Sequence, residues 1–139
     1  MAKDSWSLDD PLTTDDLDAL LSFLPTFDAE GFRFATFRRS EGNSIGGWDY
    51  GPEAIAFIEA AYAHGFVCSF AWPAWASTDG RRIMENTREI ERVDLATLRR
   101  LFTTWIRGDR FCDGALATVY ESGAVRCALD RLEVLRRAM

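Results

Sequence analysis

An anion site is the chemistry that the residue types in the middle of this sequence suggest first. On a helix of 3.6 residues per turn, Arg100, Thr103 and Arg107 fall on one side, and Arg110 follows shortly after them. The planar guanidinium group matches the paired oxygens of phosphate or carboxylate. The spacing therefore predicts that these four residues bind a small anionic ligand.

A solvated surface is the plainer interpretation of the same stretch. In that case Arg107 or Arg110 forms an ion pair with Asp109 or Asp113, and such exposed pairs contribute little to stability. Asp113 also has a chemical alternative, as the acid/base group of an enzyme that acts on a nucleotide-like or phosphorylated substrate. Because no catalytic constellation accompanies it, the sequence favours a non-enzymatic binding or regulatory module.

Two tryptophans, Trp72 and Trp75, flank Pro73 in an aromatic stretch. Aromatic rings beside a proline in a non-helical segment can form a stacking platform for a base or a peptide. Large aromatic side chains are also commonly buried, and the two rings then anchor a loop over the core. For a binding function, the tryptophans must meet Arg107 and Arg110 at one accessible hollow that recognises a small anionic ligand or a protein partner.

The charge distribution limits the class of partner. The net charge is −6, yet residues 81–110 hold 8 basic and 5 acidic side chains, while residues 1–80 hold 4 and 13. A globally acidic chain repels a phosphate backbone at long range. Extended nucleic-acid binding is therefore disfavoured, whereas a local arginine patch can still hold one small anion.

The cysteine and histidine content predicts a cytoplasmic protein without a metal or cofactor. Cys68, Cys112 and Cys127 are odd in number and lack CxxC spacing, which fits a reducing compartment. One histidine, His64, cannot supply a multi-histidine zinc set, and its place at a predicted helix end suits it to capping. There is no run of membrane-spanning length, so we expect no membrane segment.

Helical periods dominate the chain and position these candidates. Asp94 is an expected N-cap and Gly108 an expected left-handed stop, with Arg99 on the polar side of the helix between them. Caps, apolar periods and breakers predict further helices from Thr13 or Thr14 to Pro25, from Pro52 to Gly65, and over residues 124–139. A short helix is expected after a turn at Asp79 and Gly80. Another is expected to be capped by Asp109, to turn Phe111 inward and to end at Gly123. Alternation over residues 31–37 predicts a strand, with a return strand near residues 45–50.

These elements indicate a mainly α fold, α+β at the margin. We expect a single-domain helical bundle of about five to six helices with a short β-hairpin near residues 31–50. Residues 1–12 are polar and acidic and are expected to be a flexible lead-in, so the globular domain spans residues 13–139. The last helix carries an apolar stripe that closes the core or contributes to a homodimer.

The central stretch also carries a resemblance to a known family. The segments TLRRLFTTWIRGDRFCDG, FAWPAW and ESG-x-x-x-x-x-L-x-RL resemble DUF6508, a bacterial family of uncharacterised proteins, over residues 17–135. The resemblance implies family-typical residues at these positions: Trp72, Trp75, Thr103, Arg107, Arg110, Phe111, Asp113 and Gly114. Many relatives have histidine at positions 105 and 115, where this chain has Trp105 and Ala115. The resemblance therefore implies no histidine-dependent reaction or metal site here.

Overall fold

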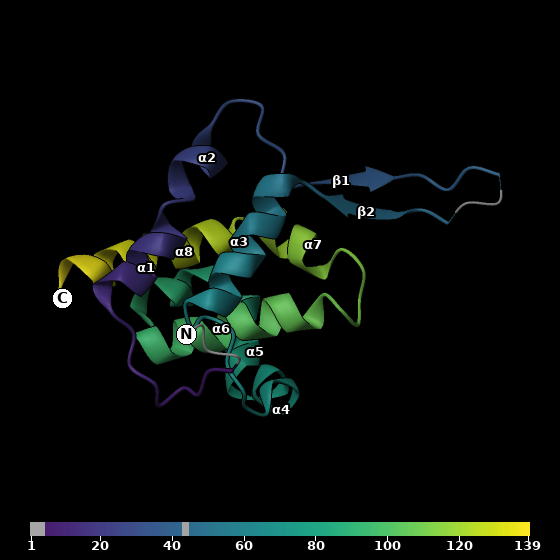
Figure 1. Cartoon of the computed structure of the whole chain (residues 1–139). Coiled ribbons are helices and arrows are strands. Elements are labelled where there is room, and N and C mark those ends of the chain that lie inside the picture. Colours follow the sequence, from purple (N-terminus) through teal and green to yellow (C-terminus); the bar gives the residue numbers. More distant parts are fainter. Residues whose placement is uncertain (1–4, 43–44) are drawn as a thin grey trace.

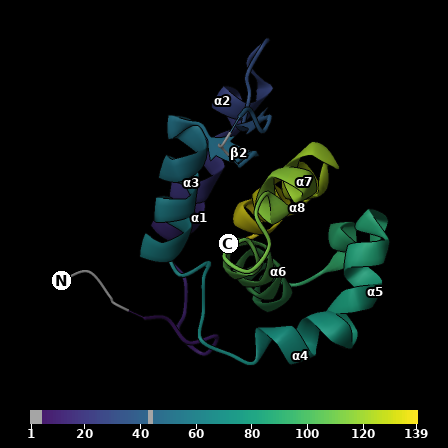
Figure 2. The ribbon, with the colours of Figure 1, turned by 90° about the vertical axis from the view of Figure 1, so that its right-hand side faces the viewer.

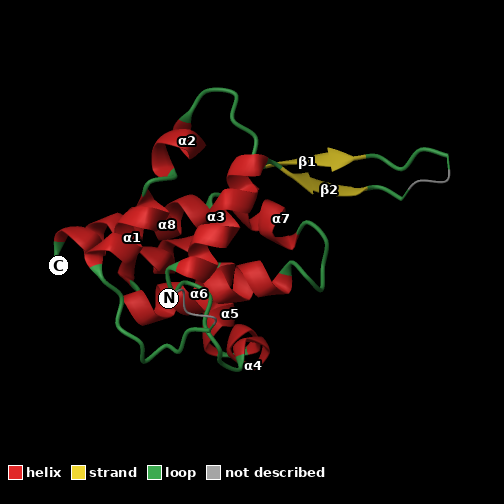
Figure 3. Cartoon of the chain, viewed as in Figure 1, coloured by secondary structure: helices red, strands yellow, loops and turns green. Residues whose placement is uncertain are grey.

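The computed structural model describes residues 5–42 and 45–139. Within them the chain forms eight α-helices, six of which have at least seven residues, one 3₁₀ helix and one two-stranded hairpin (Figure 1, Figure 3). In chain order the elements are α1 (Thr14–Leu21), α2 (Leu24–Asp28), β1 (Ala35–Arg38), β2 (Gly47–Tyr50), α3 (Pro52–Ala63), α4 (Trp72–Ser77), α5 (Asp79–Glu85), the 3₁₀ helix η1 (Thr87–Arg92), α6 (Leu95–Gly108), α7 (Ala115–Glu121) and α8 (Ala124–Arg137). The predicted mainly helical domain with a short hairpin is confirmed.

Helix α6 forms the centre of the bundle (Figure 2). As predicted, Asp94 caps its start, because its side chain accepts a hydrogen bond from the Thr97 N–H at 2.8 Å. The helix ends at Gly108, but the left-handed conformation expected there occurs at Gly114 instead, with φ of 81°. The apolar side of α6 faces the core and is buried by its neighbours, through Leu98, Leu101, Phe102, Trp105 and Ile106.

The polar side of α6 departs from the prediction, because Arg99 is buried rather than solvated. It is only 3% exposed. Its guanidinium donates hydrogen bonds to four main-chain carbonyl oxygens, those of Gly65 at 2.7 Å, Asp10 at 2.7 Å, Ser7 at 3.0 Å and Leu8 at 3.2 Å. A buried cation is tolerated when its donors are satisfied in this way. The part of the expected lead-in from residue 7 to residue 10 is thus tied to α6, and residues 1–4 lie outside the described part of the chain.

The hairpin projects from the helical body as an arm (Figure 1). Its strands pair antiparallel with Phe37 opposite Trp48, and the two ring centroids lie 5.4 Å apart in an edge-to-face arrangement. On the other face, Arg38 Nη1 lies 3.1 Å from Asp49 Oδ1. Both strands are shorter than the predicted stretches, and residues 43 and 44 of the expected connecting loop lie outside the described residues.

The aromatic stretch expected to be non-helical contains helix α4. Pro73 occupies its first turn, where a missing N–H costs nothing, so this proline starts a helix instead of preventing one. The turn expected at Asp79 and Gly80 is the first turn of α5. Gly80 is required there for packing, because a Cβ would lie 2.6 Å from ring carbons of Trp75.

Helix α8 closes the core with its apolar stripe. Val125, Leu129 and Leu132 are fully buried in the domain, where α8 packs on α1 and η1. On the outer side, an ion pair between residues four positions apart joins Arg126 Nε to Asp130 Oδ1 at 2.8 Å. These three side chains of the stripe are therefore covered by other elements of the same chain.

Candidate ligand-binding site

Two separate hollows each combine candidate arginines with a tryptophan of α4. Arg107 also borders a third hollow, with a volume of about 400 Å³, beside Trp6 and Glu59. The Trp72 hollow has a volume of about 450 Å³ and is lined by Trp72, Pro73, Arg107, Arg110 and Phe111. The Trp75 hollow has a volume of about 640 Å³ and is lined by Trp75, Thr78, Asp79, Arg82, Ile83, Thr97 and Arg100. The structure thus brings Trp72 together with Arg107 and Arg110, and Trp75 together with Arg100, but it does not gather all six candidates in one place.

Thr103 lines neither hollow. It is fully buried, donates a hydrogen bond to the Arg99 carbonyl at 2.7 Å and accepts one from the Cys68 N–H at 2.9 Å. Its hydroxyl therefore joins the chain after α3 to α6. Burial also raises the pKa of the Cys68 thiol, which keeps this neighbouring group protonated.

Aromatic and cationic side chains meet in the Trp72 hollow. The rings of Trp72 and Phe111 have centroids 6.0 Å apart and are tilted by 38°. Phe111 was expected to face the core, yet it is 82% exposed, because the chain turns between residues 109 and 114 before α7 begins. Arg107 rises from the last turn of α6, and its Nε is buried without a hydrogen-bond partner among the described residues.

The two arginines of the Trp72 hollow form no ion pair with Asp109 or Asp113, because these two carboxylates bind other groups. Asp109 Oδ1 accepts hydrogen bonds from the Tyr50 hydroxyl at 2.5 Å and from the Leu116 N–H at 3.0 Å. Asp113 Oδ2 accepts the Trp48 N–H at 3.0 Å. Within the described part of the chain, Arg107 and Arg110 form none of the ion pairs present.

Tyr50 links the hairpin to the start of α7. Its hydroxyl donates to Asp109 and accepts the Ala117 N–H at 3.2 Å. Burial raises the pKa of Tyr50 above its ordinary value, and the hydrogen bond to Asp109 raises it further. The hydroxyl therefore stays protonated at neutral pH. Asp109 is not the local N-cap that was expected, because α7 begins after Gly114, but its carboxylate reaches the Leu116 N–H in the first turn of α7.

Asp113 and Gly114 contact Trp48 of the hairpin and line neither the Trp72 hollow nor the Trp75 hollow. The exposed carboxylate of Asp113 holds the main chain of β2 at Trp48. The indole of Trp48 lies so close to Gly114 that a Cβ there would collide with it. Asp113 thus has a structural partner at the position where an acid/base group was considered.

The residues that sequence reasoning missed are Asp79, Arg82 and Thr97 of the Trp75 hollow. A signal for Arg82 is present in the sequence, because its neighbour Arg81 has Glu85 four residues later and pairs with it at 2.8 Å. The residue four positions after Arg82 is Asn86, so Arg82 lacks the i,i+4 partner that Arg81 has, although Asp79 and Glu85 lie three positions away on either side. Asp79 and Thr97 carry no comparable local signal.

Comparison with known families agrees with the resemblance seen in the sequence. The model of a family of unknown function, DUF6508, matches residues 12–138. The chain belongs to DUF6508. No curated protein and no solved structure matches this DUF6508 chain.

The residues that carry the resemblance to DUF6508 fall into three spatial groups. Trp72, Arg107, Arg110 and Phe111 line the Trp72 hollow, whereas Trp75 lines the Trp75 hollow. Others hold the scaffold, as Gly114 does beneath the hairpin. The resemblance to DUF6508 therefore includes residues of both hollows and of the elements that shape them.

The described residues contain neither a cluster of metal-ligating side chains nor a helix of membrane-spanning character. Within residues 5–42 and 45–139, no group of three or more His, Cys, Asp or Glu side chains is placed to hold a metal ion. In the same residues, none of the helices combines the length and the apolar character needed to cross a bilayer.

Proposed function

We propose that this DUF6508 domain is a non-enzymatic binding or regulatory module that recognises a small anionic ligand with a flat ring at the Trp72 hollow. The observation that carries the proposal is that Arg107 and Arg110 form no ion pair with the carboxylates that follow them in the sequence. Asp109 and Asp113 are committed to the hairpin and α7. The two guanidinium groups are therefore available to phosphate or carboxylate oxygens.

The buried Nε of Arg107 supports an anion at this place. A buried donor without a partner loses its bond to water and gains nothing in return, which costs about 1–3 kcal/mol. An oxygen atom of a bound ligand would remove that cost. The vacant donor thus supports an anion near Arg107, which borders the Trp72 hollow and the hollow beside Trp6.

Size and shape favour a small molecule over a polymer. A volume of about 450 Å³ lies within the range of small-molecule sites. The rings of Trp72 and Phe111 offer surfaces for a planar group, while the net charge of −6 opposes a long polyanion. Three free cysteines fit a reducing compartment, so we place the module in the cytoplasm.

A thermal-shift panel followed by isothermal titration calorimetry tests the proposal. The probes are nucleoside monophosphates and aromatic carboxylates, with inorganic phosphate as the probe for charge alone. We expect at least one ring-bearing anion to raise the melting temperature. Arg107→Gln and Arg110→Gln should each weaken its binding by about tenfold or more, since each removes a charge-assisted hydrogen bond.

Arg100→Gln is the matched control, because Arg100 lies on the same helix but lines the Trp75 hollow. It should leave the dissociation constant of the ring-bearing anion unchanged. Equal binding by the wild type, Arg107→Gln and Arg110→Gln would contradict the proposal, as would a panel in which no probe binds.

A further inference from the structure

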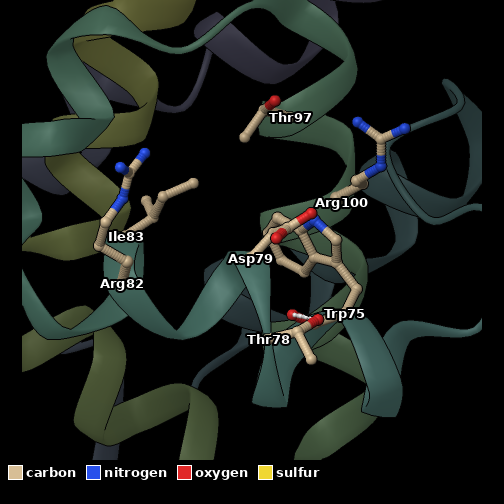
Figure 4. A pocket seen from close by; sticks show the side chains of 7 residues that line it. All are labelled: Trp75, Thr78, Asp79, Arg82, Ile83, Thr97 and Arg100. Carbon is tan, nitrogen blue, oxygen red and sulfur yellow. Dashed lines mark hydrogen bonds between the residues drawn. The ribbon is translucent and has the colours of Figure 1, made fainter.

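We propose that the Trp75 hollow is a docking surface for an acidic peptide segment of a partner protein. Figure 4 shows Arg82 and Arg100 on opposite sides of the hollow, with Trp75 between them. The arginines come from α5 and α6, and the tryptophan comes from α4. A ligand that meets both guanidinium groups must therefore extend across the indole ring.

The charges of the hollow select an acidic partner. Neither Arg82 nor Arg100 takes part in an ion pair with a described residue. By contrast, the exposed Arg81, which precedes Arg82 on α5, is paired with Glu85. The two arginines outweigh the single carboxylate of Asp79, so the lining is locally positive in a chain of net charge −6. Opposite charge on a partner accelerates encounter and selects against basic segments.

Trp75 is held in place before any partner arrives. One side of its six-membered ring rests on Gly80, and Phe70 packs against it with ring centroids 6.2 Å apart at 75°. A fixed aromatic ring loses little conformational entropy on binding. Tryptophan and arginine are also the side chains that contribute most often to the energy of protein interfaces.

The polar lining fits an extended main chain better than one compact anion. Asp79 lies beside Trp75 in the middle of the hollow, where its carboxylate repels a single central anion and accepts a peptide N–H. Thr97 lines the hollow with a hydroxyl that can donate to a peptide carbonyl. An apolar side chain on Trp75, flanked by two acidic side chains that reach Arg82 and Arg100, satisfies all of these groups.

Selection from a displayed library of random short peptides tests this inference on the full chain. Wild-type protein should enrich peptides in which acidic residues flank an apolar or aromatic residue. The same selection on the Arg82→Gln/Arg100→Gln double variant should lose that acidic signature. For one enriched peptide, titration should show about tenfold weaker binding to either single variant.

Arg81→Gln is the matched control, because it removes an arginine from the same helix outside the hollow. It should leave the affinity of the enriched peptide within about twofold of the wild type. Trp75→Ala should abolish binding, while its circular dichroism spectrum shows that the fold is kept. The inference is overturned by enriched peptides without acidic excess, by no enrichment at all, or by competition from inorganic phosphate or nucleoside monophosphates at equal concentration. Arg107→Gln should have no effect, which separates this test from that of the Trp72 hollow.

Discussion

At the scale of single residues, the arginines of α6 have unlike roles although they share a helix. Arg99 donates all of its observed hydrogen bonds to main-chain carbonyl oxygens. Arg100 and Arg107 instead line hollows and form no ion pair with the described residues. Local spacing identifies the pairs that lie four residues apart on a helix, as it does for Arg126 and Asp130. It cannot reveal the burial of Arg99, because the partners of that residue come from distant segments.

The role of Arg99 predicts a large loss of stability on substitution. Arg99→Met leaves several buried carbonyl oxygens without donors, and we expect the free energy of unfolding to fall by about 3 kcal/mol. Urea denaturation measures the change. The neighbouring substitution Arg100→Met should shift the free energy of unfolding by less than about 0.5 kcal/mol, and equal losses for the two variants would contradict the assigned role.

At the scale of elements, the hairpin binds two carboxylates that could otherwise neutralise the arginines of the Trp72 hollow, although no hairpin residue lines that hollow. Tyr50 on β2 and the main chain at Trp48 hold Asp109 and Asp113, the two carboxylates nearest to Arg107 in the sequence. The sequence predicts the strands, because alternation is a local pattern, but it places the start of α7 too early, because Asp109 reaches the Leu116 N–H across seven residues. It leaves open whether these aspartates pair with arginines, because that choice depends on where the hairpin packs.

Removal of one hydroxyl tests this coupling. Tyr50→Phe deletes the hydrogen bonds to Asp109 and from the Ala117 N–H, so we expect a loss of about 1–2 kcal/mol in the free energy of unfolding and faster hydrogen exchange of the hairpin amides. The freed Asp109 should also compete for Arg107 and weaken anion binding. Tyr120→Phe is the matched control, since Tyr120 is also partly buried and its hydroxyl has no hydrogen bond among the described residues. Unchanged exchange in Tyr50→Phe would contradict the coupling.

At the scale of the whole molecule, contacts between distant parts of the chain close the bundle. Arg136 of α8 pairs with Asp18 of α1 at 2.8 Å, and His64 Nδ1 at the end of α3 lies 2.9 Å from Asp16 Oδ1. His64 thus has a partner beyond the capping role expected for it. These contacts tie α1 to the end of α3 and to α8, so the first, middle and last thirds of the chain are joined.

The contact of Asp16 predicts how stability depends on pH. Burial alone would raise the pKa of Asp16, but hydrogen bonds from Thr13 and His64 outweigh it and hold the pKa below its ordinary value of 3.8. A carboxyl whose pKa is lower in the folded state stabilises the protein above its unfolded pKa, and this contribution is lost as the pH falls through the folded pKa. We therefore expect the loss of stability below pH 3.8 to be shallower in Asp16→Asn than in the wild type.

Urea denaturation at a series of pH values measures this difference. Asp15→Asn is a matched control on the first turn of the same helix, because Asp15 is exposed and takes part in none of the ion pairs of the described residues. Its pH profile should follow that of the wild type. Parallel profiles for Asp16→Asn and the wild type would show that Asp16 contributes nothing to acid unfolding.

The close approach of Trp48 to Gly114 has a consequence for the evolution of the chain. A side chain at position 114 and an indole at position 48 exclude each other, so position 114 can enlarge only after position 48 has become smaller. A lineage that gains a larger residue at 114 must therefore have given up the tryptophan first. Relatives with a residue other than glycine at 114 should accordingly lack tryptophan at 48.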